Sequence, residues 1–271
     1  MKISKLLENF EFKKHFGQNF ILDTNFQNAI VSDCDLDKDD EVLEIGAGAG
    51  TLTLALAKAC KKVVTFEKDT SLKSILDTVI TEDNVDIHFD DILSLDLDQI
   101  ESLFESSYHM VANLPYYITT PIIFHFIESR RLKTMNIMVQ KEVAERICAK
   151  PGTKDYGILT LMIRFYGNAK IVRHINRNMY VPSPKVDSAM VRIELHHDFD
   201  SDLEEVYSTL VHSAFSMRRK TLKNNLSKGL GLDADTIDTL LQGYSPSVRG
   251  ESLAYEDYLE LSRRYVKLFE K

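Results

Sequence analysis

The sequence predicts an α/β protein: a mainly parallel, seven-stranded sheet with helices on both faces, followed by a small all-helical domain. Three observations support this prediction. Five apolar, β-branched runs alternate with segments of helical periodicity, which is typical of a parallel sheet whose strands are connected by helices. Two more strand-like runs then follow each other with only a loop between them. After about residue 198, helical periodicity alone remains.

The runs expected to form the parallel strands are EVLEIGAG (41–48), KVVTFEKD (62–69), VDIHFDD (85–91), HMVANLPY (109–116) and TMNIMVQKE (134–142). Helical segments are expected between them, among others at 51–60 and 118–132. Crossovers in such sheets are right-handed, and ligands bind in a crevice at the carboxyl ends of the strands. The residues that follow each strand are therefore the first candidates for a functional site.

The later runs AKIVRHI (169–175) and SAMVRIEL (188–195) are expected to close the sheet as an antiparallel pair. Beyond them, apolar residues recur at helical spacing from Leu203 to Ala214, and again from Tyr258 to Leu268. We therefore expect one domain at 1–198 and a helical domain at 199–271, with HHDFDSD as the linker.

The composition is that of an ordinary soluble protein, because 44% of its 271 residues are hydrophobic and can bury a large core. The N-terminus lacks the features of a signal peptide, and no stretch approaches the roughly 18 continuous apolar residues of a membrane helix. We expect a cytoplasmic protein. Cys34, Cys60 and Cys148 show neither a paired nor a metal-ligand spacing, so we expect free thiols and no metal.

The formal charge of −8 argues against indiscriminate binding to nucleic acid. The segment from Lys141 to Arg192 differs, since it holds ten Lys or Arg side chains and four acids. If these cations gather on one face, a polyanion can dock there. The alternative is that they are ordinary solvated charges.

A glycine-rich loop, EIGAGAG (44–50), follows the first of these strands and opens a helix. Gly46, Gly48 and Gly50 permit a sharp turn and the close approach of a ligand. The loop does not meet the G-x-G-x-x-G fingerprint for pyrophosphate, because Thr51 occupies its sixth position. Preceded by Glu44, the loop suits a neutral or cationic nucleoside such as S-adenosylmethionine, which carries a sulfonium and no phosphate.

The next two strands end on acids. Glu67 lies 21 residues beyond Gly46, where a carboxylate can accept both hydroxyls of a ribose. Asp91 ends the third strand, where it can accept from the exocyclic amine of an adenine. Each acid by itself is an ordinary surface residue of an α/β protein; their succession at three strand ends indicates a nucleoside site.

The fourth strand ends in Asn113, Leu114, Pro115 and Tyr116. The Asn113 side-chain oxygen and the Leu114 carbonyl can hold the hydrogens of an adenine amine out of the ring plane, which favours the transition state of methyl transfer. Pro115 directs the loop, and the ring of Tyr116 offers a stacking face for the base. The alternative is a strand-exit turn with Tyr116 and Tyr117 packed inside.

Six long motifs together resemble, in order and spacing, the family of bacterial small-subunit rRNA adenine-N6,N6-dimethyltransferases. They are FGQNFILD (16–23), EIGAGAGTLT (44–53), NLPYYITTPI (113–122), MVQKEVAERICAKPGTKDYGILT (138–160), VPSPKVDSAMVRI (181–193) and FSMRRKTLKNNL (215–226). The resemblance implies a Rossmann-like methyltransferase domain with a helical C-terminal domain. It also implies a monomer that uses S-adenosylmethionine to dimethylate two adjacent adenosines in the 3′-terminal hairpin of 16S rRNA during ribosome biogenesis.

The resemblance also implies roles for single residues. Those matching cofactor-binding positions are Asn19, Ile21, Gly46, Gly48, Glu67, Asp91 and Asn113, and the last of these is also the amide of the catalytic loop. Tyr116 matches the stacking aromatic. The family usually has Pro where Ala47 stands, Leu where Ile21 stands and Phe where Tyr180 stands.

Two basic clusters are expected to contact RNA phosphates without reading sequence. One comprises Lys141, Arg146, Lys150 and Lys154, and the other comprises Arg218, Arg219, Lys220 and Lys223.

Three other functions remain possible from the residues. The erythromycin-resistance methyltransferases, which modify 23S rRNA, share much of the pattern, although AKPGTKDYG and RRKTLKNN fit the small-subunit group better. A ribosome-assembly factor with little catalysis is a second alternative. A nicotinamide dehydrogenase is the third, and Thr51 disfavours it.

Overall fold

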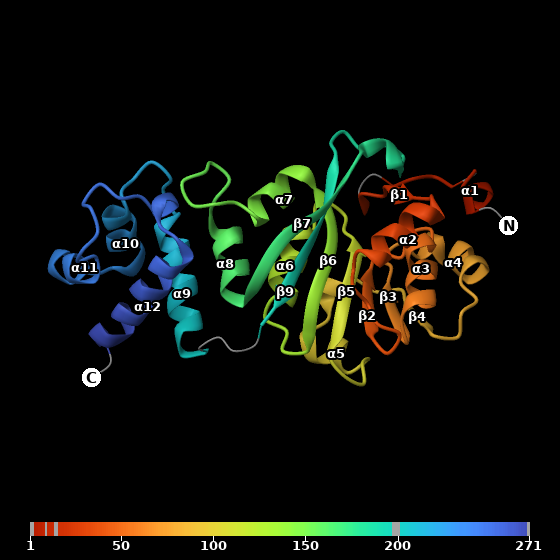
Figure 1. Cartoon of the computed structure of the whole chain (residues 1–271), viewed down its shortest axis with the longest axis horizontal. Coiled ribbons are helices and arrows are strands. Elements are labelled where there is room, and N and C mark those ends of the chain that lie inside the picture. Colours follow the sequence, from red (N-terminus) through yellow and green to blue (C-terminus); the bar gives the residue numbers. More distant parts are fainter. Residues whose placement is uncertain (1–2, 9, 14–15, 197–200, 270–271) are drawn as a thin grey trace. The chain divides into compact units, whose positions relative to one another are not determined.

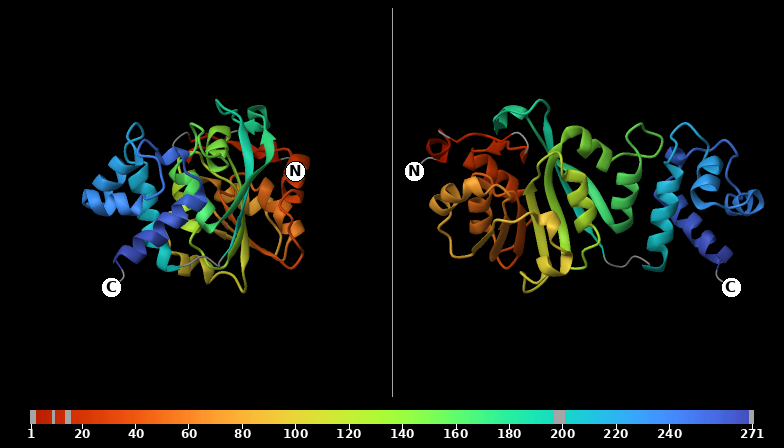
Figure 2. Two further views of the ribbon diagram at one scale, coloured as in Figure 1. Left: turned by 60° about the vertical axis from the view of Figure 1, so that its left-hand side comes forward. Right: turned by 180° about the vertical axis from the view of Figure 1, so that it is seen from behind.

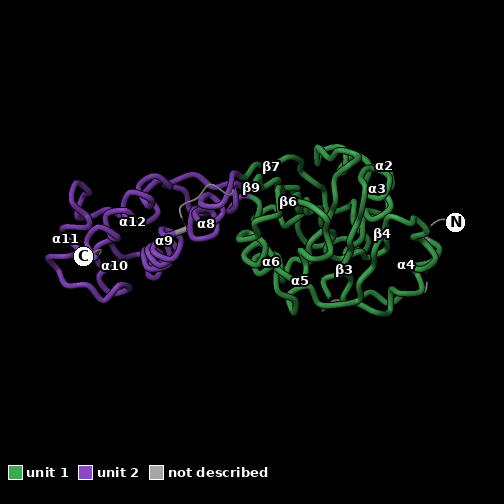
Figure 3. Tube along the Cα trace, turned by 90° about the horizontal axis from the view of Figure 1, so that it is seen from below, with its two compact units in different colours: residues 1–144, 169–195 green, residues 145–168, 196–271 purple. Residues whose placement is uncertain are grey.

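The structure, a computed structural model, describes residues 3–8, 10–13, 16–196 and 201–269. It divides into two compact units, one formed by residues 1–144 and 169–195 and the other by residues 145–168 and 196–271 (Figure 3). Within the described residues, no helix is both long enough and apolar enough to cross a membrane.

The first unit contains a seven-stranded sheet with the strand order β4-β3-β2-β5-β6-β9-β7 (Figures 1 and 2). Its strands are β2 (Glu41–Ile45), β3 (Lys62–Phe66), β4 (Val85–His88), β5 (Tyr108–Asn113), β6 (Leu132–Gln140), β7 (Gly167–Ile175) and β9 (Ser188–Leu195). The first five pair in parallel, and β9 pairs antiparallel with β6. The expected parallel sheet with an antiparallel addition is therefore confirmed.

The chain reverses its direction across the sheet at β2 and β5. From β2 it proceeds to β3 and β4 on one side, and then it returns to β5 on the other side of β2. Every residue of β2 is buried, as expected for a central strand covered on both faces. Ligand crevices of α/β sheets form at such a reversal, beyond the carboxyl ends of the strands.

Helices cover both faces of this sheet, with α2 and α3 on one face and α5 and α6 on the other (Figure 3). The helices of this unit are α1 (Ile3–Leu6), α2 (Thr24–Ser32), α3 (Thr51–Ala59), α4 (Lys73–Val79), α5 (Leu97–Glu101) and α6 (Thr119–Phe126), and α7 (Lys141–Ile147) begins in it. Side chains of α2 and α3, among them Ile30 and Leu56, form one hydrophobic core with Val42, Val111 and Met138 of the sheet.

The helix expected over 118–132 is shorter than predicted. It ends at Phe126, and β6 already begins at Leu132. The intervening turn is stabilised by Ser129, whose hydroxyl oxygen accepts hydrogen bonds from the backbone N–H groups of Arg131 and Leu132. Because this turn depends on side-chain bonds, apolar spacing did not reveal it.

A second, two-stranded sheet was not predicted. Strand β1 (Phe20–Ile21) pairs antiparallel with β8 (Tyr180–Val181), so that Ile21 lies opposite Tyr180. Two-residue strands carry no periodicity of their own. This pairing joins the segment before α2 to the loop between β7 and β9, 160 residues later in the chain.

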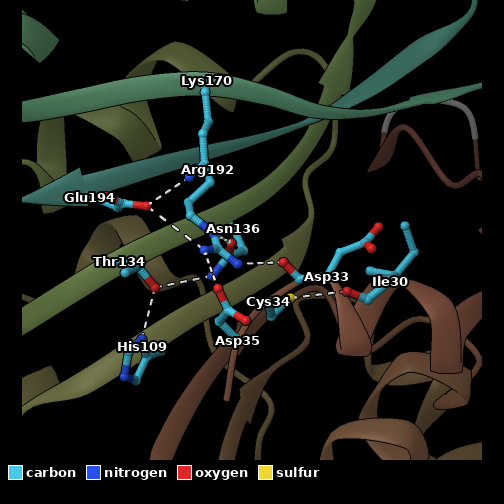
Figure 4. Close-up of polar contacts among 10 residues, drawn as sticks. All are labelled: Ile30, Asp33, Cys34, Asp35, His109, Thr134, Asn136, Lys170, Arg192 and Glu194. Atoms are coloured by element: carbon cyan, nitrogen blue, oxygen red, sulfur yellow. Dashed lines mark hydrogen bonds and ion pairs between the residues drawn. The ribbon is translucent and has the colours of Figure 1, made fainter.

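A polar cluster fastens the end of α2 to the sheet (Figure 4). The buried guanidinium of Arg192 on β9 donates to Asn136 Oδ1 at 3.1 Å, to Asp35 Oδ2 at 2.8 Å and to the backbone carbonyl of Asp33. Asn136 in turn donates to Thr134 Oγ1 at 3.0 Å. A buried charge needs such partners, since an unpaired one is costly to remove from water. The cluster thus fixes the position of α2.

The second unit is helical. It contains α8 (Ile158–Tyr166), α9 (Ser201–Ala214), α10 (Leu222–Leu230), α11 (Ala234–Leu240) and α12 (Tyr255–Phe269), which appear from α8 in green to α12 in dark blue in Figure 1. The predicted apolar stripes face its core at Leu203, Tyr207, Leu210, Tyr258 and Leu261, whereas Leu268 near the helix end is exposed.

The compact units differ from the predicted division at 198/199 in residues 145–168 and, at the boundary itself, in residues 196–198. Residues 145–168 group with the C-terminal helices because α8 packs against α9: the rings of Phe165 and Tyr207 stack at 4.5 Å, and the Tyr207 hydroxyl donates to the Leu161 carbonyl at 2.9 Å. Of the expected linker HHDFDSD, residues 197–200 lie outside the described residues.

Candidate functional site

A pocket in the first unit opens at the carboxyl ends of four parallel strands. Its lining from these strand ends comprises residues of the β2 end (Ile45, Gly46, Gly48), the β3 end (Phe66, Glu67, Lys68), the β4 end (Asp90, Asp91, Ile92, Leu93) and the β5 end (Asn113, Leu114, Pro115, Tyr116, Tyr117, Ile118). The segment 16–20 and Tyr180 complete it. The four strand ends singled out in the sequence therefore meet in one pocket.

The glycine loop closes tightly over Glu67. Gly46 and Gly48 have φ values of 82° and 55°, which L side chains rarely adopt. The backbone N–H of Gly48 donates to Glu67 Oε2 at 2.9 Å, and a Cβ on Gly48 would come within 3.0 Å of the Phe20 ring. Glycine is therefore required at this position by both conformation and space.

The carboxylate of Glu67 is held in place by the backbone. Besides the bond from Gly48, its Oε1 accepts from the N–H of Asp69 at 2.7 Å. Burial raises the pKa of Glu67, and these backbone hydrogen bonds only partly oppose that rise. Each carboxylate oxygen has a second lone pair, so Glu67 can still accept two hydroxyl groups from a ligand.

Asp91 occupies a more open part of the pocket. Its Oδ1 accepts from the N–H of Leu93 at 3.2 Å, and its Oδ2 pairs with Lys68 Nζ at 2.6 Å. The hydrogen bond from Lys68 lowers the pKa of Asp91 against the opposing effect of burial. An amine that binds Asp91 must therefore share the carboxylate with Lys68, a competition that the sequence did not reveal.

The segment 16–20 is fixed to the β3 end by Asp69. Gln18 Nε2 donates to Asp69 Oδ2 at 2.7 Å, and Lys13 Nζ pairs with Asp69 Oδ1 at 2.6 Å. Burial acts to raise the pKa of Asp69, but the hydrogen bonds from Lys13 and Ser71 outweigh it and leave the pKa lowered. Asp69 thus has two roles: its side chain orders the segment 16–20, and its backbone N–H donates to Glu67.

The same segment orients the amide of Asn113. Asn113 Nδ2 donates to the backbone carbonyl of Asn19 at 3.0 Å. An amide carries its donors on the nitrogen alone, so this bond leaves Oδ1 as the end available to a ligand. The Leu114 N–H donates to the Met138 carbonyl at 3.2 Å, and the Ile118 N–H closes a turn onto the Pro115 carbonyl at 3.1 Å. Asn113 therefore lies just before a turn, and its Oδ1 accepts no hydrogen bond from the residues that the structure describes.

The two tyrosines at the centre of this turn are not fully buried. Tyr117 is 53% exposed, and Tyr116 is half-buried with its hydroxyl 2.8 Å from the Ser188 hydroxyl on β9. Both line the pocket. The turn that was considered as an alternative is present, and both of its tyrosines are lining residues of the pocket.

Two of the predicted residues lie outside the lining. Ile21 is buried at 1% exposure, and its carbonyl accepts from Thr51 Oγ1 at 2.6 Å. Glu44 is fully buried, accepts from Thr53 Oγ1 at 2.6 Å, and has its pKa raised to about 7 by burial. The expectation that Glu44 makes the loop suitable for a cation is therefore not supported by direct contact; Glu44 supports α3 beneath the loop.

Several lining residues were missed, notably Phe16, Gln18, Lys68 and Tyr180. Phe16 and Gln18 adjoin Asn19 in the motif FGQNFILD, which was the available signal. Nothing in the local sequence indicated that Tyr180 reaches this pocket.

The basic residues expected to bind RNA are exposed, apart from half-buried Lys223. Lys141 begins α7 in the first unit. In the second unit the two predicted clusters meet, because Arg218 donates to the Lys154 carbonyl at 2.7 Å. Lys223 forms an ion pair with Asp238 of α11. Lys150, Lys154, Arg218, Arg219 and Lys220 thus leave exposed cationic side chains in the second unit.

Comparison with known proteins extends these observations. A family model described as ribosomal RNA adenine dimethylase matches residues 9–266. The proteins named Ribosomal RNA small subunit methyltransferase A from Geobacillus thermodenitrificans and Clostridium acetobutylicum are 43% and 41% identical to this chain, over 96% and 94% of it and 93% and 94% of their own lengths.

Two solved structures are similar over most of their length. A dimethyladenosine transferase from Plasmodium falciparum has a TM-score of 0.76 at 26% identity, covering 90% of this chain and 96% of its own. The 23S rRNA methyltransferase ErmE has a TM-score of 0.70 at 25% identity, covering 91% of this chain and 99% of its own.

Proposed function

The chain belongs to the ribosomal RNA adenine dimethylase family, and on that premise we propose that it transfers methyl groups from S-adenosylmethionine to N6 of two adjacent adenosines in the 3′-terminal hairpin of 16S rRNA. The product is N6,N6-dimethyladenosine, formed during assembly of the small subunit. The proposed enzyme works as a cytoplasmic monomer on the 30S subunit or its precursor.

The observation that carries this proposal is the orientation of Asn113. One N–H of its Nδ2 donates to the Asn19 carbonyl, and Asn113 lines the pocket that also contains Glu67 and the glycine loop, so Oδ1 is proposed as the acceptor for a ligand there. An acceptor in that place fits an amine donor of the substrate.

The pocket suits S-adenosylmethionine by its charge. Three acidic residues, Glu67, Asp90 and Asp91, line it, whereas Lys68 is the one basic residue among the described lining residues. Such a surface favours a ligand with a positive charge over a diphosphate. Glu67 would accept the ribose hydroxyls, Asp91 the adenine amine, and Asn19, Gly46 and Gly48 would enclose the remainder. When bound, S-adenosylmethionine supplies the methyl group on a sulfonium leaving group.

The chain's own contribution to the reaction is positioning. The nitrogen of an adenine amine is a poor nucleophile while its lone pair is delocalised into the ring. Asn113 Oδ1 and the Leu114 carbonyl would hold its two hydrogens out of the ring plane, an interaction strongest in the transition state. The ring of Tyr116 supports the base by stacking, and Pro115 directs the loop. An amide is no useful general base, so alignment by these groups dominates.

The small-subunit rRNA is favoured over the 23S rRNA as substrate. Relatives named for the small subunit are 41–43% identical to this chain, whereas the 23S enzyme ErmE is 25% identical. The deciding experiment incubates the chain with labelled S-adenosylmethionine and either 30S particles or 50S particles that lack the modification, and then maps the labelled nucleotides. We expect label on two adjacent adenosines near the 3′ end of 16S rRNA. Label confined to 23S rRNA, or RNA binding without label, would favour the 23S enzyme or the assembly factor instead.

The exposed cations of the second unit are proposed to anchor RNA phosphates. We expect Arg218→Ala with Arg219→Ala to weaken RNA binding and to lower the slope of log affinity against log salt by about 1 to 2, because each neutralised phosphate contributes about 0.7 to 0.9 to that slope. Binding measured over a salt series tests this. Arg263→Ala with Lys267→Ala removes two exposed charges from α12 of the same unit, and this matched control should leave the slope unchanged. Equal slopes for both double variants would assign the arginines to an ordinary solvated surface.

A further inference from the structure

Tyr180 lines the pocket from an element that the sequence did not place there. It is the first residue of β8, it lies opposite Ile21 of β1, and it is 2% exposed. Tyr116, which also lines the pocket and is close enough to act on the pKa of Tyr180, lies in the turn that the Ile118 N–H closes onto the Pro115 carbonyl. Tyr180 therefore lies near Tyr116, where the target base is proposed to bind.

The hydroxyl of Tyr180 is buried and has no hydrogen-bond partner among the described residues. Ser188 is close enough to act on the Tyr180 hydroxyl and to lower its pKa, but among the described residues the Ser188 hydroxyl lies at hydrogen-bond distance, 2.8 Å, from the Tyr116 hydroxyl and not from that of Tyr180. Burial raises the pKa of Tyr180, so the phenol keeps its proton and can donate it. A buried hydroxyl without a partner is costly to stability, and one that borders a pocket is satisfied most directly by a ligand.

We propose that the Tyr180 hydroxyl donates a hydrogen bond to a ring nitrogen of the target adenine, N1 or N7, and so contributes to the selection of adenine. The inference rests on the proposed function. N1 and N7 are the ring acceptors on either side of the exocyclic amine, N1 on the Watson–Crick edge and N7 on the Hoogsteen edge. A donor beside the acceptors Asn113 Oδ1 and Leu114 O matches an amine next to a ring nitrogen. Guanine and uracil carry a carbonyl oxygen in place of this amine. That oxygen cannot donate a hydrogen bond and would face the two acceptors, Asn113 Oδ1 and the Leu114 carbonyl.

The test compares Tyr180→Phe with the unaltered chain on 30S particles or RNA fragments containing adenosine, 1-deazaadenosine or 7-deazaadenosine at the target position. Phenylalanine keeps the ring and is the residue usual in the resembling family, so this variant removes the hydroxyl alone. We expect kcat/KM for RNA to fall about 10-fold, in line with the loss of one hydrogen bond. The dissociation constant of S-adenosylmethionine should stay within about twofold, and Tm should be unchanged or higher, because an unpaired buried group has been removed.

The deaza substrates identify the partner. With the unaltered chain, one of the two analogues should cost about the same 10-fold, and with Tyr180→Phe that analogue should cost nothing further. A wild-type kcat/KM for Tyr180→Phe would overturn the proposal, as would equal sensitivity of both enzymes to both analogues or a loss confined to cofactor affinity. If the unaltered chain methylates no adenosine, it is the proposed function that fails.

The matched control is Tyr156→Phe. Tyr156 lies in the second unit, is 7% exposed, and also has a hydroxyl without a partner among the described residues. It does not line the pocket. This variant should raise or preserve Tm in the same way and leave kcat/KM and the response to both analogues unchanged. A drop of equal size in both variants would show that buried tyrosine hydroxyls act on activity through the fold.

Discussion

Replacing Asn113 by alanine is expected to lower kcat for adenosine methylation by about 100- to 1000-fold, the range observed when one transition-state hydrogen bond is removed. The loss follows because Oδ1 is the acceptor that the Asn19 carbonyl leaves available. RNA affinity should be preserved, since the phosphate contacts are made elsewhere. Single-turnover methylation at saturating S-adenosylmethionine and RNA measures the effect, and near-normal turnover would exclude the proposed role.

Asn84→Ala is the matched control for this variant. Asn84 lies in the same unit, and its Nδ2 likewise donates to backbone carbonyls, those of Ala57 at 2.9 Å and Cys60 at 3.2 Å. It does not line the pocket. Its replacement should lower Tm through the lost bonds and leave kcat unchanged, which separates a catalytic effect of Asn113 from the general cost of losing a tethered amide.

The second large effect is expected at Glu67. Glu67→Ala removes a carboxylate that is positioned by Gly48 and Asp69 to accept two ribose hydroxyls. Hydrogen bonds to a charged group contribute about 1.5 to 3 kcal/mol each, so the dissociation constant of S-adenosylmethionine should rise at least about 100-fold. Calorimetric titration with S-adenosylmethionine measures it.

The binding should also depend on pH in a defined direction. Burial raises the pKa of Glu67 above its usual 4.5, so on acidification the carboxylate is protonated at a higher pH than an exposed glutamate. The accepting form is thus fully present above the raised pKa, and cofactor affinity should fall as pH drops through it. Glu67→Ala should remove this dependence. An affinity that is independent of pH down to the ordinary range of glutamate would contradict the assignment.

Glu41→Ala provides the control for Glu67. Glu41 is the first residue of β2, at the end of that strand away from the glycine loop. It is 1% exposed, and its carboxylate also accepts two backbone N–H groups, from Glu105 at 2.8 Å and Ser106 at 3.1 Å. Its loss should destabilise the fold without changing the affinity for S-adenosylmethionine. A similar loss of affinity in both variants would mean that the Glu67 effect arises from unfolding.

The sequence predicted the strands well because their signal is local. EVLEI (41–45), for example, was predicted as a strand of a sheet covered by helices, and all five of its residues are buried. The carboxyl ends of parallel strands meet at one edge, which predicts that Gly46, Glu67, Asp91 and Asn113 lie together, and all four line one pocket. The failures arose where the structure depends on particular hydrogen bonds and not on a repeating apolar pattern. The turn at Ser129 and the two-residue strands β1 and β8 depend on contacts that periodicity does not report.

What the sequence by itself determined is the family, the sheet, the helical C-terminal part and the set of strand ends that form the pocket. Only the tertiary structure decided how those residues are used. The amide of Asn113 is oriented by a carbonyl 94 positions away in the chain, Tyr116 and Ser188 meet across 72 positions, and Arg218 reaches Lys154 across 64. The physical reason is that a hydrogen bond depends on distance and direction in space, whereas spacing along the chain controls only which residues share a face of one helix or strand.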